Sequence, residues 1–292
     1  MSNQVDTLSA ESPVILMPTS IEKAVELKSH YGLNGEFVSG ATLLQLQWLN
    51  GRKTPEQIIS LEQLTELKSI QFDQHKGELS IGALTPLGSY QTHKILKEFP
   101  IICTALKSIA APGIRNRGTI GGNIMGRVGD LIPFLSALSA KLVFQDVKGV
   151  KQIEIWDWFQ QTSNSDFLLS HILIPLDRDM LESHTFYRKV GRRETFTAAI
   201  LTVSGKIKWD EEGKIINAKL AVGGGDNKPM RLEKTEQLII GRNAIHLDWK
   251  TIFSTVAEEF VAAEDAFVSS SYRKKVAANL IVAELQSQFA KE

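Results

Sequence analysis

The first part of the chain alternates between strand and helix patterns, and this alternation constrains the fold more than any other feature. Short apolar runs of strand type cover residues 14–18, 35–40 and 56–61, and helical patterns cover 19–32 and 42–51 between them. Strands joined by a single helix pair in parallel, because the helix returns the chain to the end of the sheet where the strand began. The sequence therefore predicts a small parallel sheet of the βαβαβ type.

From about residue 62 the pattern is mixed. A hairpin is centred on Lys76-Gly77 and a second strand pair on Lys148-Gly149, with helical patterns between them and an apolar strand that ends near Leu176. Residues 184–225 then alternate like a three-stranded antiparallel meander. The last part of the chain, about 60 residues, is predicted to be mainly two helices.

These changes divide the chain near Pro175 and the polar segment that follows it. We predict the α+β class. The first domain covers residues 1–177 and consists of two subdomains, at about 13–61 and 62–177. The second domain covers 178–292 and combines a three-stranded antiparallel sheet with helices.

Charge and cysteine content limit the ligands that the chain can bind. The 33 basic and 33 acidic residues give a formal net charge of zero, so no overall field attracts nucleic acid or an anionic membrane. Cys103 is the only cysteine, and the six histidines include no pair four residues apart. We therefore expect neither a metal site nor an iron-sulfur cluster held by this chain. Without a long apolar run or a signal-peptide pattern, a cytoplasmic protein is expected.

Two stretches place glycine beside small hydroxyl residues ahead of a helix. In "FVSGATLL", the strand Phe37-Val38 runs through residues 39–42 into a helical pattern, and such a loop can present backbone N–H groups and the positive helix end to an anion. In "RGTIGGNI", residues 117–124, two glycines permit a bend and a close approach of the backbone, and Thr119 and Asn123 add polar groups. Each stretch alone is also typical of a structural feature: a helix-capping loop in the first case and a turn in the second.

Together, the two stretches indicate a binding site that neither indicates alone. They lie about 80 residues apart, in different predicted subdomains, so together they could hold one extended pyrophosphate, as a dinucleotide cofactor would require. Neither the Rossmann fingerprint nor the P-loop pattern occurs. A third glycine-rich run, "VGGGDNKP" at residues 222–229, is predicted to be a loop after a strand.

Five segments in a fixed order carry a family resemblance: "VSGATLL", "IAAPGIRNRGTIGGNIM", "GDLIPFLSALSAKLVF", "FYRKVGRRE" and "YRKKVAANLI". With them, the chain from about Pro18 to its end resembles the FAD-binding medium subunit of the molybdenum hydroxylases, of the xanthine dehydrogenase and carbon monoxide dehydrogenase type. The resemblance implies a two-subdomain FAD-binding unit of the PCMH, or vanillyl-alcohol-oxidase-like, type. A C-terminal domain of the CO dehydrogenase flavoprotein type would follow it.

The resemblance also implies roles for residues of the two loops. Val38, Ser39, Gly40, Ala41 and Thr42 would bind the pyrophosphate through N–H groups. Ser39 stands where many members have glycine and Ala41 where they have a polar residue, so a side-chain contact at position 41 is not implied.

The second loop and the later motifs would complete the FAD site. The implied residues are Thr119, Gly121 and Gly122, which would close on the pyrophosphate from the other side; Ile109 and Ala110, which would line the cofactor; Asn123, beside the phosphate or ribitol; Asp130, near the adenosine part; Leu168, whose backbone would meet the flavin ring; and Lys189, near its pyrimidine edge.

By resemblance, the chain is an FAD-dependent oxidoreductase subunit with no catalytic side chain of its own. It would take electrons from an iron-sulfur small subunit, work beside a molybdopterin large subunit, and pass electrons to NAD⁺ or another acceptor. Two alternatives stay open at this point. One is a stand-alone FAD enzyme of the vanillyl-alcohol-oxidase superfamily, and the other is a non-enzymatic assembly subunit that has lost FAD.

Overall fold

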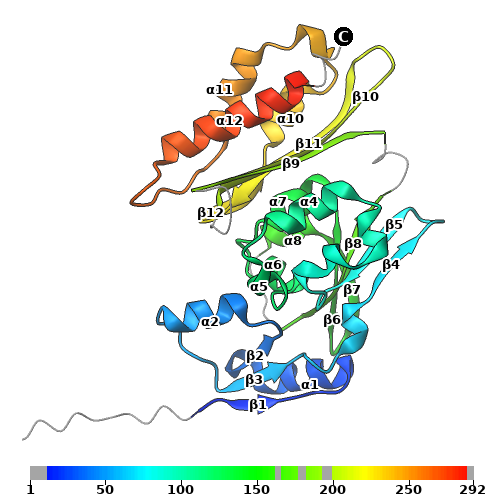
Figure 1. Ribbon diagram of the computed structural model, residues 1–292, viewed down its shortest axis with the longest axis vertical. Helices are drawn as coiled ribbons and strands as arrows, with labels where there is room; N and C mark the ends of the chain where they lie inside the picture. Colours follow the sequence, from blue (N-terminus) through cyan, green and yellow to red (C-terminus); the bar gives the residue numbers. More distant parts are fainter. Residues whose placement is uncertain (1–11, 162–165, 177–181, 193–198, 288–292) are drawn as a thin grey trace, which may run out of the picture.

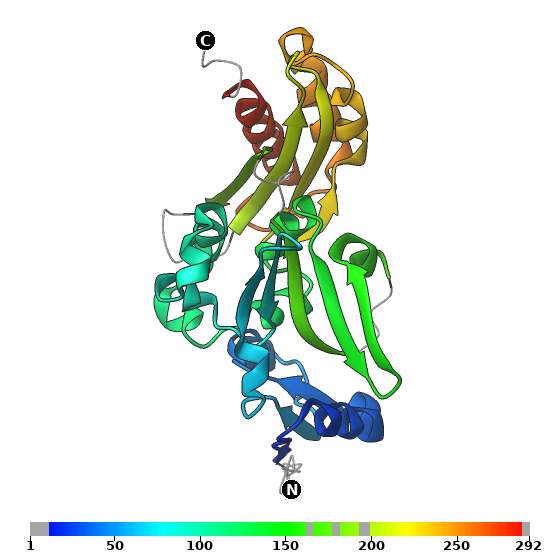
Figure 2. The same ribbon diagram turned by 90° about the vertical axis from the view of Figure 1, so that its right-hand side faces the viewer.

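A computed structural model describes residues 12–161, 166–176, 182–192 and 199–287. The molecule is elongated, and its three β-sheets follow one another along the long axis (Figure 1). The N-terminal sheet lies at one end, a five-stranded sheet in the middle, and the C-terminal sheet with its helices at the other end (Figure 2). No helix in the described ranges is long and apolar enough to cross a membrane.

The N-terminal sheet is parallel, as the alternating pattern predicts. Its strand order is β1-β3-β2, and both neighbouring pairs run parallel. The elements are β1 (Val14–Leu16), α1 (Ile21–Tyr31), the 3₁₀ turn η1 (Gly32–Asn34), β2 (Gly35–Val38), α2 (Thr42–Leu49) and β3 (Gln57–Ser60).

The middle sheet has the order β4-β5-β8-β6-β7, with antiparallel pairing throughout. Both predicted hairpins are present, as β4-β5 and β6-β7. The elements are η2 (Thr65–Lys68), β4 (Ile70–Asp73), β5 (Glu78–Gly82), η3 (Leu87–Gln91), α3 (Lys94–Lys97), α4 (Pro100–Ser108), α5 (Pro112–Arg115), α6 (Ile120–Met125), α7 (Leu131–Ala137), β6 (Lys141–Asp146), β7 (Gly149–Glu154), α8 (Ile155–Gln160) and β8 (Leu168–Pro175).

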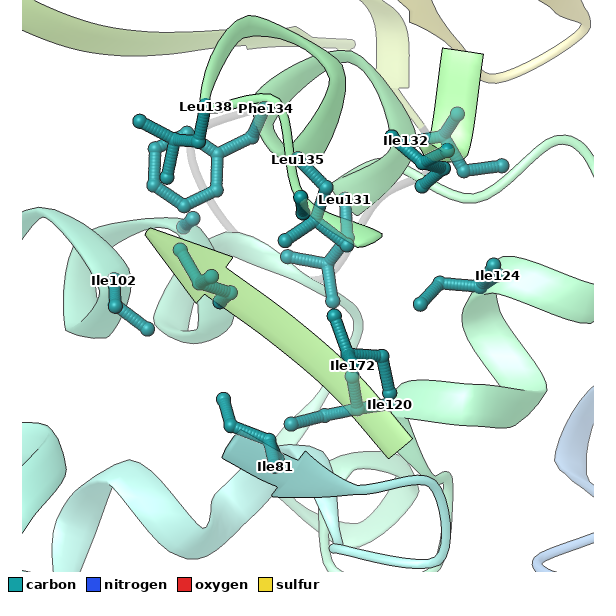
Figure 3. Close-up of a cluster of buried hydrophobic side chains, with 14 of the residues drawn as sticks. Ile81, Ile102, Ile120, Ile124, Leu131, Ile132, Phe134, Leu135, Leu138 and Ile172 are labelled. Atoms are coloured by element: carbon teal, nitrogen blue, oxygen red, sulfur yellow. The ribbon is translucent and has the colours of Figure 1, made fainter. Parts of the chain in front are cut away.

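A single apolar core fixes α6 and α7 on this sheet. Ile120 and Ile124 of α6 point toward Ile172 of β8, and Phe134 of α7 lies in the same cluster (Figure 3). All four side chains are almost fully buried. Because these short helices pack on the sheet through such residues, the polar residues at their N-termini hold defined positions.

The stretch "RGTIGGNI" is not the bend that its two glycines suggest. Thr119 is the N-cap of α6, its hydroxyl accepts a hydrogen bond from the N–H of Gly122, and both glycines belong to the helix. Neither glycine has a positive φ. A Cβ on Gly121 would lie 2.7 Å from the Cβ and carbonyl oxygen of Ala83, so this glycine allows the helix to touch the end of β5.

The prediction of three C-terminal strands is wrong, because the sheet has four, in the order β12-β11-β10-β9. The predicted loop at residues 222–229 contains a tight turn at Gly224 (φ +79°) and Gly225 (φ +61°), after which the chain returns as the fourth strand. That strand has five residues, one of them proline, so its alternation is hard to recognise. The strands are β9 (His184–Gly191), β10 (Ala199–Trp209), β11 (Ile215–Gly224) and β12 (Asn227–Arg231).

Helices cover both faces of this sheet. One face carries the C-terminal helices, and α7 of the middle region packs against β10 and β11 from the other side. The predicted pair of long helices is present, preceded by a short third one: α10 (Glu233–Ile239), η4 (Ala244–His246), α11 (Trp249–Glu259) and α12 (Ser270–Ser287). Helix α7 therefore joins the two halves of the molecule, and its N-terminus lies where they meet.

Candidate functional site

A cavity of about 710 Å³ lies between the N-terminal sheet and the middle region. Its walls come from the loop before α2 and from α2 itself, from the α4–α5 link, and from α6 with the segment that leads to α7. Further parts come from α8 and from the start of β8. This volume is within the range of small-molecule and cofactor sites.

The first loop offers unused backbone donors to this cavity. Ala41 has a left-handed conformation (φ +56°) and turns the chain directly into α2, which has no side-chain cap. The first helical hydrogen bond runs from the N–H of Gln45 to the carbonyl of Ala41. Among the described residues, no hydrogen bond uses the N–H groups of Gly40, Ala41, Thr42 or Leu43. Free donors at the positive end of a helix favour a bound anion.

The two loops touch each other, as their proposed joint role requires. A Cβ on Gly40 would lie 1.9 Å from the carbonyl oxygen of Arg117, so the backbones of the two loops are in contact there. Beside this contact, the hydroxyl oxygens of Ser39 and Thr119 are 3.1 Å apart and share a hydrogen bond. The structure therefore joins two segments 80 residues apart into one wall of the cavity.

The second loop keeps its backbone donors for the protein itself. The N–H of Ile120 donates to the carbonyl of Thr85 (3.0 Å), and the N–H of Gly121 donates to the carbonyl of Ala83 (2.8 Å). Those of Gly122 and Asn123 donate to the side chain and the carbonyl of Thr119 (3.0 Å each). The two glycines therefore have different roles. Gly121 allows close packing, and Gly122 leaves an open surface, because an added Cβ there would meet only the Thr119 hydroxyl.

Asn123 and Asp130 form the adjoining part of the cavity wall. The Asn123 Oδ1 accepts a hydrogen bond from the N–H of Leu131 (3.3 Å), which leaves its amide NH₂ without a partner among the described residues. Asp130 precedes α7 and binds the ammonium group of Lys189 at 2.7 Å. The side chains of Asp130 and Lys189 are only 12% and 11% exposed, so most of this ion pair is shielded from solvent.

A small polar network continues behind Asp130. Lys189 also donates to the carbonyl of Ser108 (2.9 Å), and the Ser108 hydroxyl shares a 2.8 Å hydrogen bond with the Tyr187 hydroxyl. Burial, reinforced by the charge of Asp130, raises the pKa of Tyr187 far above its usual value, so its phenol stays neutral. The network ties α4, α7 and β9 together.

Nearly all of the site residues expected from the sequence meet at this cavity. Val38 does not line it, because this residue is buried at the end of β2 and its carbonyl accepts a hydrogen bond from Leu61 (2.8 Å). Lys189 does not line it either and reaches it through Asp130. The residues that line it are Ser39, Gly40, Ala41, Thr42, Ile109, Ala110, Thr119, Gly121, Gly122, Asn123, Asp130 and Leu168.

Sequence reasoning missed an aromatic and cationic part of the wall. Arg127 has a positive φ of 58°, its guanidinium lies 4.5 Å from the ring centroid of Trp158, and one terminal nitrogen donates to the carbonyl of Phe159. Arg127, Trp158 and Phe167 all line the cavity. The "WDWF" run is the only hint in the sequence, because neither the left-handed backbone nor the stacking is visible there.

Two further lining residues come from the C-terminal half, and one from the N-terminal helix. Ala199 and Gly225 close the cavity from the second domain. Lys28 donates to the carbonyls of Gly32 (2.8 Å) and Gly35 (2.7 Å), and burial lowers the pKa of its ammonium group. A lysine inside an amphipathic helix gives no sign of such a position.

The cavity fits a long anionic cofactor. The helix N-terminus with free N–H groups suits a phosphate, and the glycines at 40 and 122 leave room for it to approach the backbone. The aromatic part suits a flat ring. No histidine, cysteine or tyrosine is among the described residues that line the cavity. Of its possible acid–base groups, Asp130 is held in an ion pair with Lys189, and Lys28 donates to two backbone carbonyls.

The chain matches two known domain families in succession. Residues 9–177 match the family described as the FAD binding domain in molybdopterin dehydrogenase. The chain belongs to this family. Residues 185–287 of this FAD subunit match the CO dehydrogenase flavoprotein C-terminal domain. The chain is therefore a medium subunit of the molybdenum hydroxylase family, its cofactor is FAD, and it is part of an oxidoreductase.

Individual relatives agree with this assignment. The FAD subunit is 29% identical to the glyceraldehyde dehydrogenase medium chain of Sulfolobus acidocaldarius over 228 residues, which cover 76% of this chain and 79% of the relative. It is 23% identical to the nicotinate dehydrogenase FAD-subunit of Eubacterium barkeri, with coverages of 77% and 78%. A solved structure of carbon monoxide dehydrogenase from Hydrogenophaga pseudoflava shares the fold, with a TM-score of 0.85 at 21% identity, covering 95% of this chain and 97% of the other.

Proposed function

We propose that this subunit carries electrons within a molybdenum hydroxylase complex. It receives them from an iron-sulfur small subunit and passes them to NAD⁺ or another acceptor. The supporting observation is the cavity itself: its wall combines free backbone donors, a glycine surface and cations, with Glu36 and Asp130 as its only carboxylates among the described residues. Such a wall binds and orients a redox cofactor, and bound FAD supplies the chemistry of single- and paired-electron exchange.

The residues of the cavity divide this task. The N–H groups of Ala41, Thr42 and Leu43 hold the pyrophosphate at the positive end of α2. Gly122 lets the cofactor approach the second loop, and the amide NH₂ of Asn123 donates to the phosphate or ribitol part. The proposal places the adenosine part near Asp130.

The flavin end lies where the two halves of the molecule meet. Ile109 and Ala110 line one side of it, and the backbone of Leu168 is proposed to contact the ring. Lys189 is paired with Asp130 at 2.7 Å, so in this arrangement it lies beside the adenosine part and not at the flavin ring, and its role is to hold and neutralise the Asp130 carboxylate. We place the domain boundary at residue 177, which is the first residue of a segment, 177–181, outside the described residues.

The partners follow from what the chain lacks in sequence and from the names of its relatives. The relatives are called a medium chain and an FAD-subunit, which implies further subunits in those proteins. With one cysteine, this chain is not equipped to hold an iron-sulfur cluster. We propose a small subunit with iron-sulfur clusters and a large subunit with molybdopterin as its partners.

Purification of the native complex tests the proposal. We expect the chain to be isolated with two other subunits, with one FAD per chain, and with the cluster and flavin absorption both bleached by the substrate of the complex under anaerobic conditions. The isolated chain with FAD should be reduced by NADH if NAD⁺ is the acceptor. A chain that is purified alone and oxidises an organic substrate at full rate would contradict the proposal.

A further inference from the structure

Two hydroxyl groups connect the loops of the FAD cavity. The Ser39 Oγ and the Thr119 Oγ1 are 3.1 Å apart, and both residues line the cavity. Thr119 Oγ1 also accepts the N–H of Gly122 at 3.0 Å. A hydroxyl has one proton to donate and two lone pairs, so this acceptor role leaves the Thr119 proton available for Ser39.

The exposure of the two side chains indicates which hydroxyl donates to the other. Thr119 is 7% exposed and lies against the start of α6, whereas Ser39 is less deeply buried and borders the cavity. When the Thr119 hydroxyl donates to Ser39, the Ser39 proton is free to point toward a ligand. The sequence of donors is then Gly122 N–H, Thr119 O–H and Ser39 O–H.

We propose that Ser39 is an anion-binding side chain that connects the second loop to the pyrophosphate of FAD. The second loop has no free N–H group of its own at residues 120–123, since all four donate within the protein. Through Thr119 and Ser39, the N–H group of Gly122 is still connected to the phosphate, because linked hydrogen bonds polarise one another. This inference rests on the proposed position of the pyrophosphate at the first loop.

The expected effect of losing Ser39 is large enough to measure. A hydrogen bond to a charged group has roughly twice the strength of a neutral one, so Ser39→Ala is expected to weaken FAD binding by about tenfold to a hundredfold. ADP shares the pyrophosphate, so its competition for the FAD site should weaken by a similar factor. The melting temperature of the FAD-free protein should fall only slightly, because the variant removes one partly buried hydrogen bond and creates no clash.

Thr119 variants test the connection. Thr119→Ser keeps the hydroxyl and should bind FAD like the natural chain. Thr119→Val removes both the link and the N-cap of α6, and it should lower the melting temperature as well as the FAD affinity. In the Thr119→Val background, Ser39→Ala should cost clearly less affinity than it does alone, as expected for two members of one chain of hydrogen bonds.

Ser136→Ala is the matched control, because the buried Ser136 hydroxyl in α7 has no hydrogen-bond partner in the described part of the protein. It should leave the dissociation constants of FAD and ADP unchanged. The inference is overturned if Ser39→Ala keeps FAD affinity within twofold, if it lowers the melting temperature of the FAD-free protein as much as Thr119→Val does, or if its effect on affinity adds fully to that of Thr119→Val. A natural chain that binds no FAD would instead refute the cavity assignment.

Discussion

The two loops of the cavity look alike in sequence and use their backbones in opposite ways. Each has a small hydroxyl residue and glycine ahead of a helix. Within the described ranges, however, the N–H groups of residues 40–43 in the first loop have no partner, whereas all of those at 120–123 in the second loop donate to the protein. The first loop can therefore bind an anion directly, whereas the second loop provides a fixed surface against which the first loop packs. A glycine motif at a cofactor site can therefore have two distinct physical roles. It can expose backbone N–H donors to a ligand, or it can let two backbone segments come into close contact.

The difference follows from what holds each loop in place. The second loop is anchored to the end of β5 through Ala83 and continues into the buried helix α6. The first leads into α2, which buries none of its residues. Its position depends on the contact of Gly40 with the second loop. Variants at the glycines can separate these roles.

Gly40→Val should have the largest effect. The added Cβ would overlap the Arg117 carbonyl oxygen, only 1.9 Å away, and backbone on both sides leaves no flexible group to move. We expect the loops to separate and the protein to be purified without flavin, while the C-terminal half stays folded. Flavin absorption per chain is the measurement. Gly113→Val is the control, since an added Cβ there meets no atom within 4 Å, and a Gly40→Val protein with full flavin content would refute the contact.

Gly121 and Gly122 should respond differently to the same change. In Gly121→Val the side chain meets Ala83 at 2.7 Å, and such overpacking typically costs about 1–3 kcal/mol of unfolding free energy. Gly122→Val fills the cavity instead, so it should lose FAD with little change in the stability of the FAD-free protein. Thermal unfolding without FAD, together with a flavin titration, distinguishes the two. Equal destabilisation by both variants would mean that Gly122 is also a packing position.

Lys189→Met tests the ion pair behind the cavity wall. Removing one partner of a buried pair leaves the Asp130 carboxylate unpaired, and the expected loss of unfolding free energy is about 3–5 kcal/mol. Adding Asp130→Asn should recover much of this loss. Urea unfolding is the measurement. Lys23→Met is the control, because the Lys23–Glu26 pair is about 60% exposed and should contribute less than about 1 kcal/mol.

Local sequence patterns predicted those parts of the molecule whose contacts lie close along the chain. The parallel sheet, both hairpins and the start of α2 at Thr42 follow from periodicity and turn residues. The use of the N–H group of Gly121 depends instead on Ala83, and the position of Arg127 depends on Trp158. The fourth C-terminal strand was missed for the same reason, because only its pairing with β11 makes that short segment a strand.

The smallest effect concerns Ala41, which holds the left-handed conformation at the start of α2 with φ +56°. For a residue other than glycine this conformation costs about 1–2 kcal/mol, whereas glycine adopts it freely but gains more freedom in the unfolded chain. Ala41→Gly should therefore change the unfolding free energy by less than about 1 kcal/mol, in the stabilising direction.

FAD should still bind to the Ala41→Gly protein, because the free N–H groups stay in place, and urea unfolding with a flavin titration measures both quantities. A large loss of affinity would show that the first loop needs the stiffness of alanine to hold its donors. The two loops would then both depend on rigidity, the first through a strained residue and the second through its hydrogen bonds to β5.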